Sequence, residues 1–156
     1  MDERPVGEIV SIAYRGDRGL PRPLHARATL VAGHGIQGDH KAGKSPERAL
    51  NIIDAYRLDE LVALGYDVTA GALGENLIVR GAGLDRLPLG SRVQLGESAV
   101  VRVVKPRSPC DNLKYIHADF PEAGEGRVGV LCAVETGGEI RVGDAVSALR
   151  ADPKGE

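Results

Sequence analysis

The residues most able to do chemistry lie in the segment from Lys105 to Lys114, which reads KPRSPCDNLK. An apolar run over residues 99–104 precedes it and predicts a buried strand. Pro106 and Pro109 should end that strand, because proline withholds a ladder donor and fixes φ. The thiol of Cys110 is therefore predicted to stand on a rigid corner, outside the apolar alternation of the core, where a cysteine can take part in chemistry.

The side chains around this cysteine can stabilise a negative charge or form hydrogen bonds. They are Lys105, Arg107, Ser108, Asn112 and Lys114. If a short helix opens at residues 112–113, its dipole and free amides also favour a thiolate. Asp111 opposes these effects, because a neighbouring carboxylate favours the protonated thiol. On balance we expect Cys110 to ionise readily at neutral pH.

The second cysteine, Cys132, has the pattern of a structural residue. It shares one face of a predicted strand with Val128, Val130 and Val134, at a spacing of two residues. Free cysteines in such apolar runs usually behave as small hydrophobic residues. We therefore expect Cys132 to be buried and Cys110 to be the functional thiol.

The elements that position these residues are predicted to be short strands. The chain has 21 glycines, which separate β-branched runs in the manner of an all-β sandwich or barrel. Strands are expected over residues 7–14, 28–31, 48–53, 92–95, 99–104, 129–135, 139–141 and 144–149, and at the end of segment 71–80. Hairpins are expected to turn at Gly96–Glu97 and through residues 136–138. One helix is expected between an N-cap at Asp54 and a stop at Gly65, with loops over residues 15–23 and 119–126.

Two glycine-rich segments allow both a structural and a binding interpretation. Residues 33–44 contain four glycines beside His40, Lys41 and Lys44. Their backbone amides and cations could cradle an anion, or the glycines could simply serve turns that need positive φ. At the mouth of the strand after residues 71–74, Glu75 is expected to anchor the loop, and Asn76 either anchors it or contacts a ligand.

Composition limits the classes of protein that this chain can belong to. We expect one domain over residues 1–156, with a core at about 7–149. The net charge of -2, with four Tyr, one Phe and no Trp, gives no sign of nucleic-acid binding. No leader is visible and no apolar run approaches the ~20 residues that span a bilayer. Two distant cysteines fit a reducing compartment, so a cytoplasmic protein without membrane contact is expected.

The sequence resembles the MOSC domain family, named after the C-terminal region of molybdenum cofactor sulfurases. Four patches in the family's order carry the resemblance: GIQGDH at residues 35–40 with RAL at 48–50, GENL at 74–77, PRSPC at 106–110, and GV at 129–130 with GEI at 138–140 and GD at 143–144. Together they span nearly the whole chain. The resemblance implies a mainly β protein, a MOSC-type β-barrel with a few short helices.

The resemblance also implies a cofactor and a set of residues that hold it. Cys110 would ligate molybdenum or carry sulfur, and a thiolate suits molybdenum as a soft ligand. The phosphate of the molybdenum cofactor (molybdopterin) would be held by Lys44, Arg48 or Arg107 and by glycine-rich amides. The remaining expected cofactor contacts are His40, Asn76, Ser108 and Asn112.

Three functions follow as hypotheses. The first is a molybdenum-dependent oxidoreductase that reduces N-hydroxylated small molecules, with electrons from a separate partner protein, since no iron–sulfur, flavin or nicotinamide motif is visible. The second is a non-catalytic carrier of persulfide sulfur or of the cofactor, loaded by a sulfur-donor protein. The third is a zinc site built from Cys110 with His117 or His40, although their spacing matches no usual Cys/His pattern.

Overall fold

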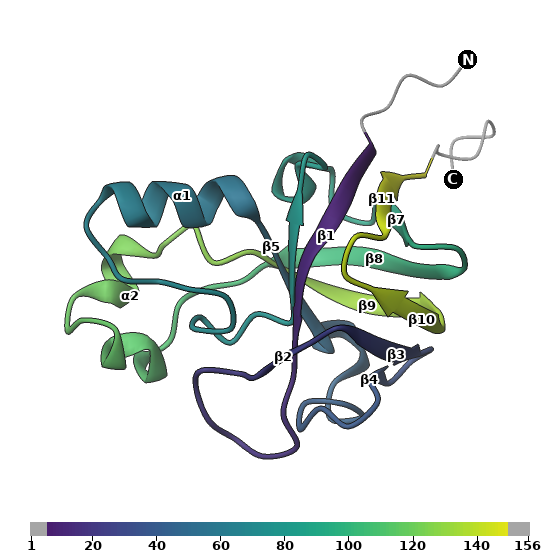
Figure 1. Ribbon diagram of the computed structural model, residues 1–156, viewed down its shortest axis with the longest axis horizontal. Coiled ribbons are helices and arrows are strands. Elements are labelled where there is room, and N and C mark those ends of the chain that lie inside the picture. The colour runs from purple at the N-terminus through teal and green to yellow at the C-terminus, as the bar shows by residue number, and fades with distance from the viewer. Residues whose placement is uncertain (1–5, 150–156) are drawn as a thin grey trace.

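The computed structural model describes residues 6–149, and its central feature is a seven-stranded barrel (Figure 1). Around the barrel the strands are β11 (Ala145–Ala148), β7 (Arg92–Leu95), β8 (Ala99–Pro106), β9 (Val130–Thr136), β5 (Leu50–Asp54), β6 (Leu77–Arg80) and β1 (Val6–Ala13). Neighbours are antiparallel except β5 and β6, which are parallel. Pairing of β1 with β11, at Gly7 and Val146, closes the barrel. The predicted mainly β barrel is confirmed.

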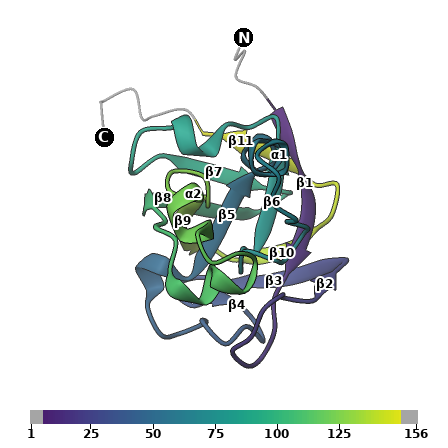
Figure 2. The same cartoon turned by 90° about the vertical axis from the view of Figure 1, so that its left-hand side faces the viewer.

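A smaller sheet packs across one end of the barrel. It contains β10 (Gly138–Arg141), β3 (Arg27–Val31) and β4 (Gly35–Ile36), while β2 (Leu24–His25) pairs with the end of β1. Figures 1 and 2 show this sheet below the barrel strands, close to the loops that carry the site. Leu30, Ile36 and Ile140 from the small sheet join the buried barrel core.

The predicted hairpin through residues 136–138 is wrong. β9 pairs with β8 and β5, whereas β10 pairs with β3, with Gly138 opposite Leu30. At Gly137 a Cβ atom would lie 2.6 Å from the carbonyl oxygen of Leu30. The glycines therefore do not form a tight turn. They allow the chain to pass close to the backbone of β3 as it leaves the barrel and enters the second sheet.

The helices cover one side of the barrel. α1 (Ala55–Ala63) follows Asp54 as predicted, and α2 (Phe120–Ala123) lies within residues 119–126, where only a loop was predicted. Phe120 is fully buried, so its packing fixes a turn that the polar residues around it did not suggest. Between the helices and the barrel lies a second apolar cluster, which includes Ile53, Leu61 and Phe120. Within the described residues, no helix is long and apolar enough to cross a membrane.

Short 3₁₀ helices replace some residues that were predicted as strand or loop. They cover Pro46–Arg48, Leu84–Arg86 and Asp111–Tyr115. The strand predicted from residue 48 therefore begins only at Leu50, because Pro46 opens a helical turn instead of donating to a ladder. This turn leaves the Arg48 side chain outside the sheet.

Candidate functional site

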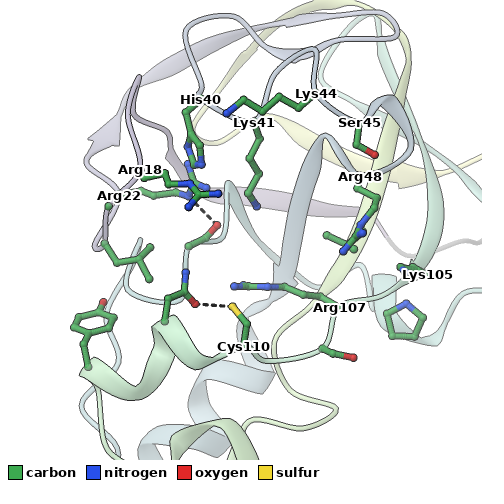
Figure 3. A pocket seen from close by; sticks show the side chains of 18 residues that line it. Arg18, Arg22, His40, Lys41, Lys44, Ser45, Arg48, Lys105, Arg107 and Cys110 are labelled. Atoms are coloured by element: carbon green, nitrogen blue, oxygen red, sulfur yellow. Dashed lines mark hydrogen bonds between the residues drawn. The ribbon is translucent and has the colours of Figure 1, made fainter.

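Cys110 stands at the corner that the sequence predicts. β8 ends at Pro106, and the 3₁₀ helix Asp111–Tyr115 begins directly after Cys110, which occupies its N-cap position. The side chain is exposed, and its thiol donates a hydrogen bond to Oδ1 of Asn112 (Figure 3). The only other cysteine in the sequence, Cys132, is fully buried in the barrel core, where burial raises its pKa to about 12. The accessible thiol is therefore Cys110.

A cavity of about 910 Å³ opens beside this thiol. Its cationic lining consists of Arg18, Arg22, Lys41, Lys44, Arg48, Lys105 and Arg107, and it has no Asp or Glu among the described residues that line it. The predicted site residues that line it are Cys110, His40, Lys44, Arg48, Arg107, Ser108 and Asn112. A volume of this size suits a cofactor or drug-sized ligand.

Most of the cavity cations lack a partner. Within residues 6–149, no ion pair or side-chain hydrogen bond engages Arg18, Lys41, Lys44, Arg48 or Lys105. Arginines elsewhere are commonly paired, as in the 2.7 Å contacts of Arg57 with Asp85 and of Arg92 with Glu135. Positive charge is therefore concentrated without compensation on the cavity wall, although the chain as a whole has a net charge of -2.

Arg107 links the cavity to the buried scaffold. Its backbone N–H donates to the Gly129 carbonyl at 2.9 Å, and its Nη1 donates to Oδ1 of Asn51 at 2.9 Å. Asn51 is fully buried, and its amide nitrogen donates to the carbonyls of Val128 and Val130, each at 3.2 Å. Burial lowers the pKa of Arg107, and the neighbouring Cys110 sulfur offsets part of that effect. The guanidinium is thus held in place beside the thiol.

Lys41 and His40 enter the cavity from the glycine-rich loop. Burial lowers the pKa of Lys41 to about 8, and the charges of Arg22 and Arg107 act in the same direction. Burial also lowers the pKa of His40, assisted by the charge of Arg22. Nδ1 of His40 is buried and has no hydrogen-bond partner in the described part of the chain. Both side chains therefore experience a positive potential that an anion would relieve.

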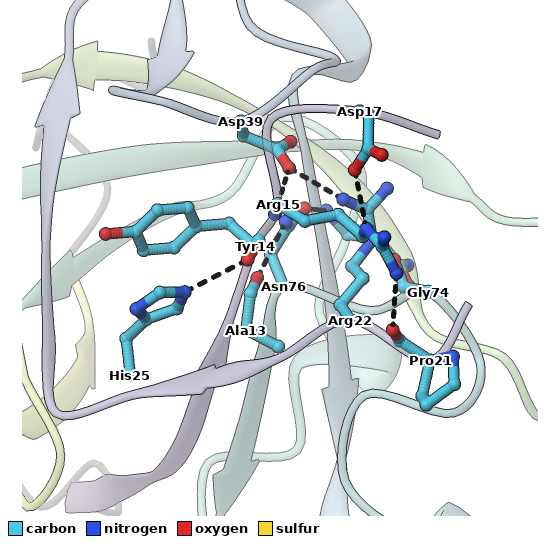
Figure 4. Close-up of polar contacts among 11 residues, drawn as sticks. Ala13, Tyr14, Arg15, Asp17, Pro21, Arg22, His25, Asp39, Gly74 and Asn76 are labelled. Atoms are coloured by element: carbon cyan, nitrogen blue, oxygen red, sulfur yellow. Dashed lines mark hydrogen bonds and ion pairs between the residues drawn. The ribbon is translucent and has the colours of Figure 1, made fainter. Parts of the chain in front are cut away.

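A buried ion pair holds the two loops that carry these cations (Figure 4). Nη1 of Arg22 lies 2.6 Å from Oδ1 of Asp39, and Nε of Arg22 donates to the Gly74 carbonyl at 2.9 Å. The Arg22 and Asp39 side chains are 3% and 0% exposed. The pair fixes the 15–23 loop against residues 39–41 and the turn at Gly74. Removing one partner of a buried ion pair leaves the other charge uncompensated, at a cost of ~3–5 kcal/mol.

Sequence reasoning missed the contributions of Arg18 and Arg22. The segment over residues 15–23 reads as a surface loop, and its arginines look solvated in a chain that is rich in arginine. Nothing local distinguishes Arg22, which becomes buried only because Asp39 and Gly74 approach from distant parts of the chain.

The prediction that Asn76 contacts the cofactor is not supported by its position. Asn76 is fully buried and does not line the cavity. Its Oδ1 accepts from the Asn51 N–H at 3.0 Å, and its Nδ2 donates to the Ala13 carbonyl at 3.1 Å. These bonds join β1, β5 and β6, so the amide serves the scaffold. The anchoring role predicted for Glu75 is confirmed, because its carboxylate accepts from the N–H groups of Gly71 and Leu73.

The hypothesis of a zinc site finds no ligand set. No three His, Cys, Asp or Glu side chains between residues 6 and 149 form a group that could hold a metal ion. His117, one of the proposed partners of Cys110, contacts Asp119 instead. His40 lies on a different wall of the cavity from Cys110 (Figure 3).

The sequence is similar to a family model and to named proteins. The family model described as "MOSC domain" matches residues 39–147. A protein named "Reductase" from Gibberella moniliformis is 30% identical over 95% of this chain and 27% of its own length. Protein YiiM of Escherichia coli is 32% identical over 68% of this chain and 52% of its own length. The chain thus spans about a quarter of the first relative and about half of the second.

Solved structures share the barrel. The YuaD protein of Bacillus subtilis superposes with a TM-score of 0.83 at 20% identity, covering 97% of this chain and all of that one. YiiM of Geobacillus stearothermophilus gives a TM-score of 0.73 at 24% identity, covering 92% of this chain and 75% of its own. At these identities the likeness is one of fold.

Proposed function

The chain belongs to the MOSC domain family, and we propose that it binds a molybdenum cofactor in the cation-lined cavity, with the Cys110 thiolate as the protein ligand of the metal. The observation that carries the proposal is an exposed thiol at the edge of a cavity lined by seven basic side chains, five of which have no partner among the described residues. A soft thiolate matches molybdenum, and unpaired Arg and Lys side chains match the phosphate of the pterin.

The donor set of the cavity fits this cofactor. Lys44 and Arg48 have no carboxylate partner within residues 6–149, so their charges are free for a phosphate. Ser108 and Asn112 lie in the lining beside the thiol and can hydrogen-bond the pterin. The guanidinium of Arg107 lies beside Cys110 and can stabilise a negative charge on its sulfur. Its tie to Asn51 means that little side-chain entropy is lost when it does so.

Reduction of an N-hydroxylated small molecule is the reaction that we assign to this site. When bound, the cofactor would supply a two-electron redox centre. The overall change, R–NHOH plus two electrons and two protons giving R–NH₂ and water, needs an electron donor. We assign that role to a separate partner protein. The relative named as a reductase supports this choice, and the chain covers only 27% of that relative.

The protein's own residues have four tasks in this reaction. Cys110 anchors the metal, and Arg107 holds charge beside it. Leu20 and Tyr115 line the cavity with apolar surface, and Tyr115 is fixed by the 2.6 Å bond from its hydroxyl to the Ala72 carbonyl. Lys41, whose pKa is about 8, can give up and regain a proton near neutral pH.

Metal analysis tests the proposal. Protein purified gently from cells that make the cofactor should contain molybdenum above background. Cys110→Ala should lose it, and the matched Cys132→Ala variant, which removes the other thiol from the core, should retain it. Absence of molybdenum from the wild type, or equal molybdenum in wild type and Cys110→Ala, would overturn the assignment.

A sulfur-carrying role is the second candidate, favoured by the exposure of Cys110 at the cavity edge, where a donor protein can reach it. In that case Arg107 would stabilise a persulfide anion. Intact-mass measurement should then find an adduct of about 32 Da, one sulfur atom, that reductant removes and that Cys110→Ala lacks. A wild-type mass without this adduct after incubation with a sulfur donor would exclude the role.

A further inference from the structure

We propose that the cavity has two anion-binding subsites on opposite walls, and that the substrate carries an anionic group of phosphate type that occupies the one left free by the cofactor. The inference rests on the proposed function only in assigning one of the two anions to the cofactor. The existence of two subsites stands on the geometry of this chain alone.

Cations lie on opposite walls of the cavity, with Lys41 and Arg107 between them (Figure 3). Figure 3 shows Arg18, Arg22 and His40 together on one wall, with the Lys44 side chain extending towards them, while Ser45 and Arg48 lie on the other. The two groups come from different elements: Arg18 belongs to the loop after β1, and Arg48 to the 3₁₀ helix Pro46–Arg48. The cavity, at about 910 Å³, is far larger than one phosphate group requires.

The first subsite consists of Arg18, His40 and Lys44. Arg18 and Lys44 are exposed and unpaired within the described residues, so each can turn towards a ligand. In Figure 3 the Lys44 side chain extends towards His40, so the two groups face the same space. The unpartnered buried Nδ1 of His40 adds a hydrogen-bonding atom that the protein itself does not use. Two cations and an imidazole match a phosphate dianion.

The second subsite consists of Ser45, Arg48 and Lys105. Arg48 and Lys105 are likewise exposed and unpaired within residues 6–149. Ser45 provides a hydroxyl directly before the turn that carries Arg48. This set again offers two positive charges and one neutral hydrogen-bonding group, so it can match a second dianion.

Cys110 and Arg107 lie between these walls (Figure 3). If the cofactor phosphate occupies the subsite on one wall, the subsite on the opposite wall stays free. A substrate that reacts at the metal beside Cys110 would then lie next to this free subsite. Leu20 and Tyr115 provide an apolar surface for the uncharged body of the substrate. A molecule with a neutral reducible head and an anionic arm fits this arrangement, and a cationic molecule is repelled by the unpaired basic side chains.

Calorimetric titration with inorganic phosphate, in low-salt buffer at neutral pH, tests the inference. Cofactor-free protein, from cells unable to make the cofactor, should bind two phosphates. Arg18→Gln and Arg48→Gln should each reduce the stoichiometry to one, and the double variant should bind none. Arg80→Gln removes an exposed arginine that does not line the cavity, and it should still bind two. A single site in the wild type, weakened by both cavity substitutions alike, would overturn the two-subsite proposal.

The same phosphate titration of cofactor-loaded protein is the second part of the test. One phosphate should still bind after loading, because the substrate's subsite remains open. Loaded protein that binds no phosphate would refute the anionic substrate while leaving the cofactor proposal intact. Failure of the protein to take up molybdenum would instead refute the cofactor proposal, and two phosphates in the unloaded protein would still support the subsites.

Discussion

Arg107 and Asn76 both bond to Asn51, yet the two polar side chains serve different purposes. Arg107 points into the cavity and is braced from behind by Asn51, so its charge is fixed beside Cys110. Asn76 belongs to the same buried network but does not line the cavity. Its side-chain oxygen and nitrogen both form hydrogen bonds to backbone groups. The first residue is placed for ligand binding and the second for holding strands together.

Asn76→Ala should therefore lower stability. The substitution leaves the Asn51 N–H and the Ala13 carbonyl without partners, at a cost of ~1–3 kcal/mol for each buried group. Asn112→Ala, which removes an exposed amide from the cavity, should change the free energy of unfolding by less than ~0.5 kcal/mol. Urea denaturation of both variants measures this contrast. Unchanged stability in Asn76→Ala would contradict the scaffold role.

Lys41 should make stability depend on pH in anion-free buffer. Its pKa falls from 10.5 to about 8 on folding, so the folded state releases this proton first. Below pH 8 the charged amine is penalised in the folded state. As pH rises from about 8 to 10.5, folded Lys41 is neutral while the unfolded chain still binds the proton, so stability increases. The gain, up to roughly 3 kcal/mol at ~1.4 kcal/mol for each pKa unit, should be absent in Lys41→Met.

The difference in unfolding free energy between wild type and Lys41→Met, measured at several pH values, isolates this effect from other titrating groups. A difference that is independent of pH between 7 and 10.5 would show that Lys41 keeps its ordinary pKa in the folded protein.

At the scale of elements, Asp54 connects the start of α1 to a distant segment of the chain, a role that its position before the helix does not reveal. It precedes the helix as an N-cap residue, yet its side chain makes no capping bond. Its two carboxylate oxygens instead accept from the N–H groups of Leu84 and Asp85, at 2.9 and 3.0 Å. The residue therefore ties the start of α1 to the 3₁₀ helix Leu84–Arg86.

Replacement of Asp54 distinguishes these two roles. Asp54→Ala should destabilise the protein by ~1–3 kcal/mol for each orphaned N–H group. Asp54→Ser should rescue little, because serine is an effective helix cap but is too short to reach two amides on another element. Thermal and urea unfolding would measure both variants. Full recovery by serine would indicate an ordinary helix cap.

Most strands were predictable from sequence because their apolar residues alternate or cluster between glycines, as in β1, β7 and β8. The corner at Cys110 was predictable from its prolines. The path from β9 to β10 was not, because Gly137 signals a turn locally and its close approach to Leu30 depends on the tertiary fold. The roles of Arg22 and Asn76 could not be predicted for the same reason. Distant segments of the chain decide whether a polar side chain faces a cavity or bonds to the backbone.

Over the whole molecule, closure of the barrel depends on a close backbone contact at Gly7. This residue pairs with Val146 of β11, and a Cβ atom on it would lie 2.3 Å from the Arg80 carbonyl oxygen. The strands β1, β6 and β11 meet at this point, so it joins the first and last strands of the barrel. The site depends on this closure indirectly, because β1 leads into the loop that carries Arg18 and Arg22.

Gly7→Ala should therefore be destabilising, by ~1–3 kcal/mol for an overpacked site. Gly16→Ala is the matched control, since a Cβ atom there would meet only the Gly38 carbonyl oxygen at 3.6 Å. A fall in the urea midpoint for the first variant and none for the second would support the closure contact. Equal midpoints would mean that β1 and β6 can separate without cost.

The distribution of charge is a property of the whole molecule, because a chain with a net charge of -2 places five unpaired cations around one cavity beside an exposed thiol. X-ray absorption at the molybdenum edge tests most directly whether these features hold the cofactor together. The wild-type spectrum should contain one more sulfur neighbour than that of Cys110→Ser loaded with the same cofactor. Identical sulfur shells in the two proteins would contradict the assignment of Cys110 as the metal ligand.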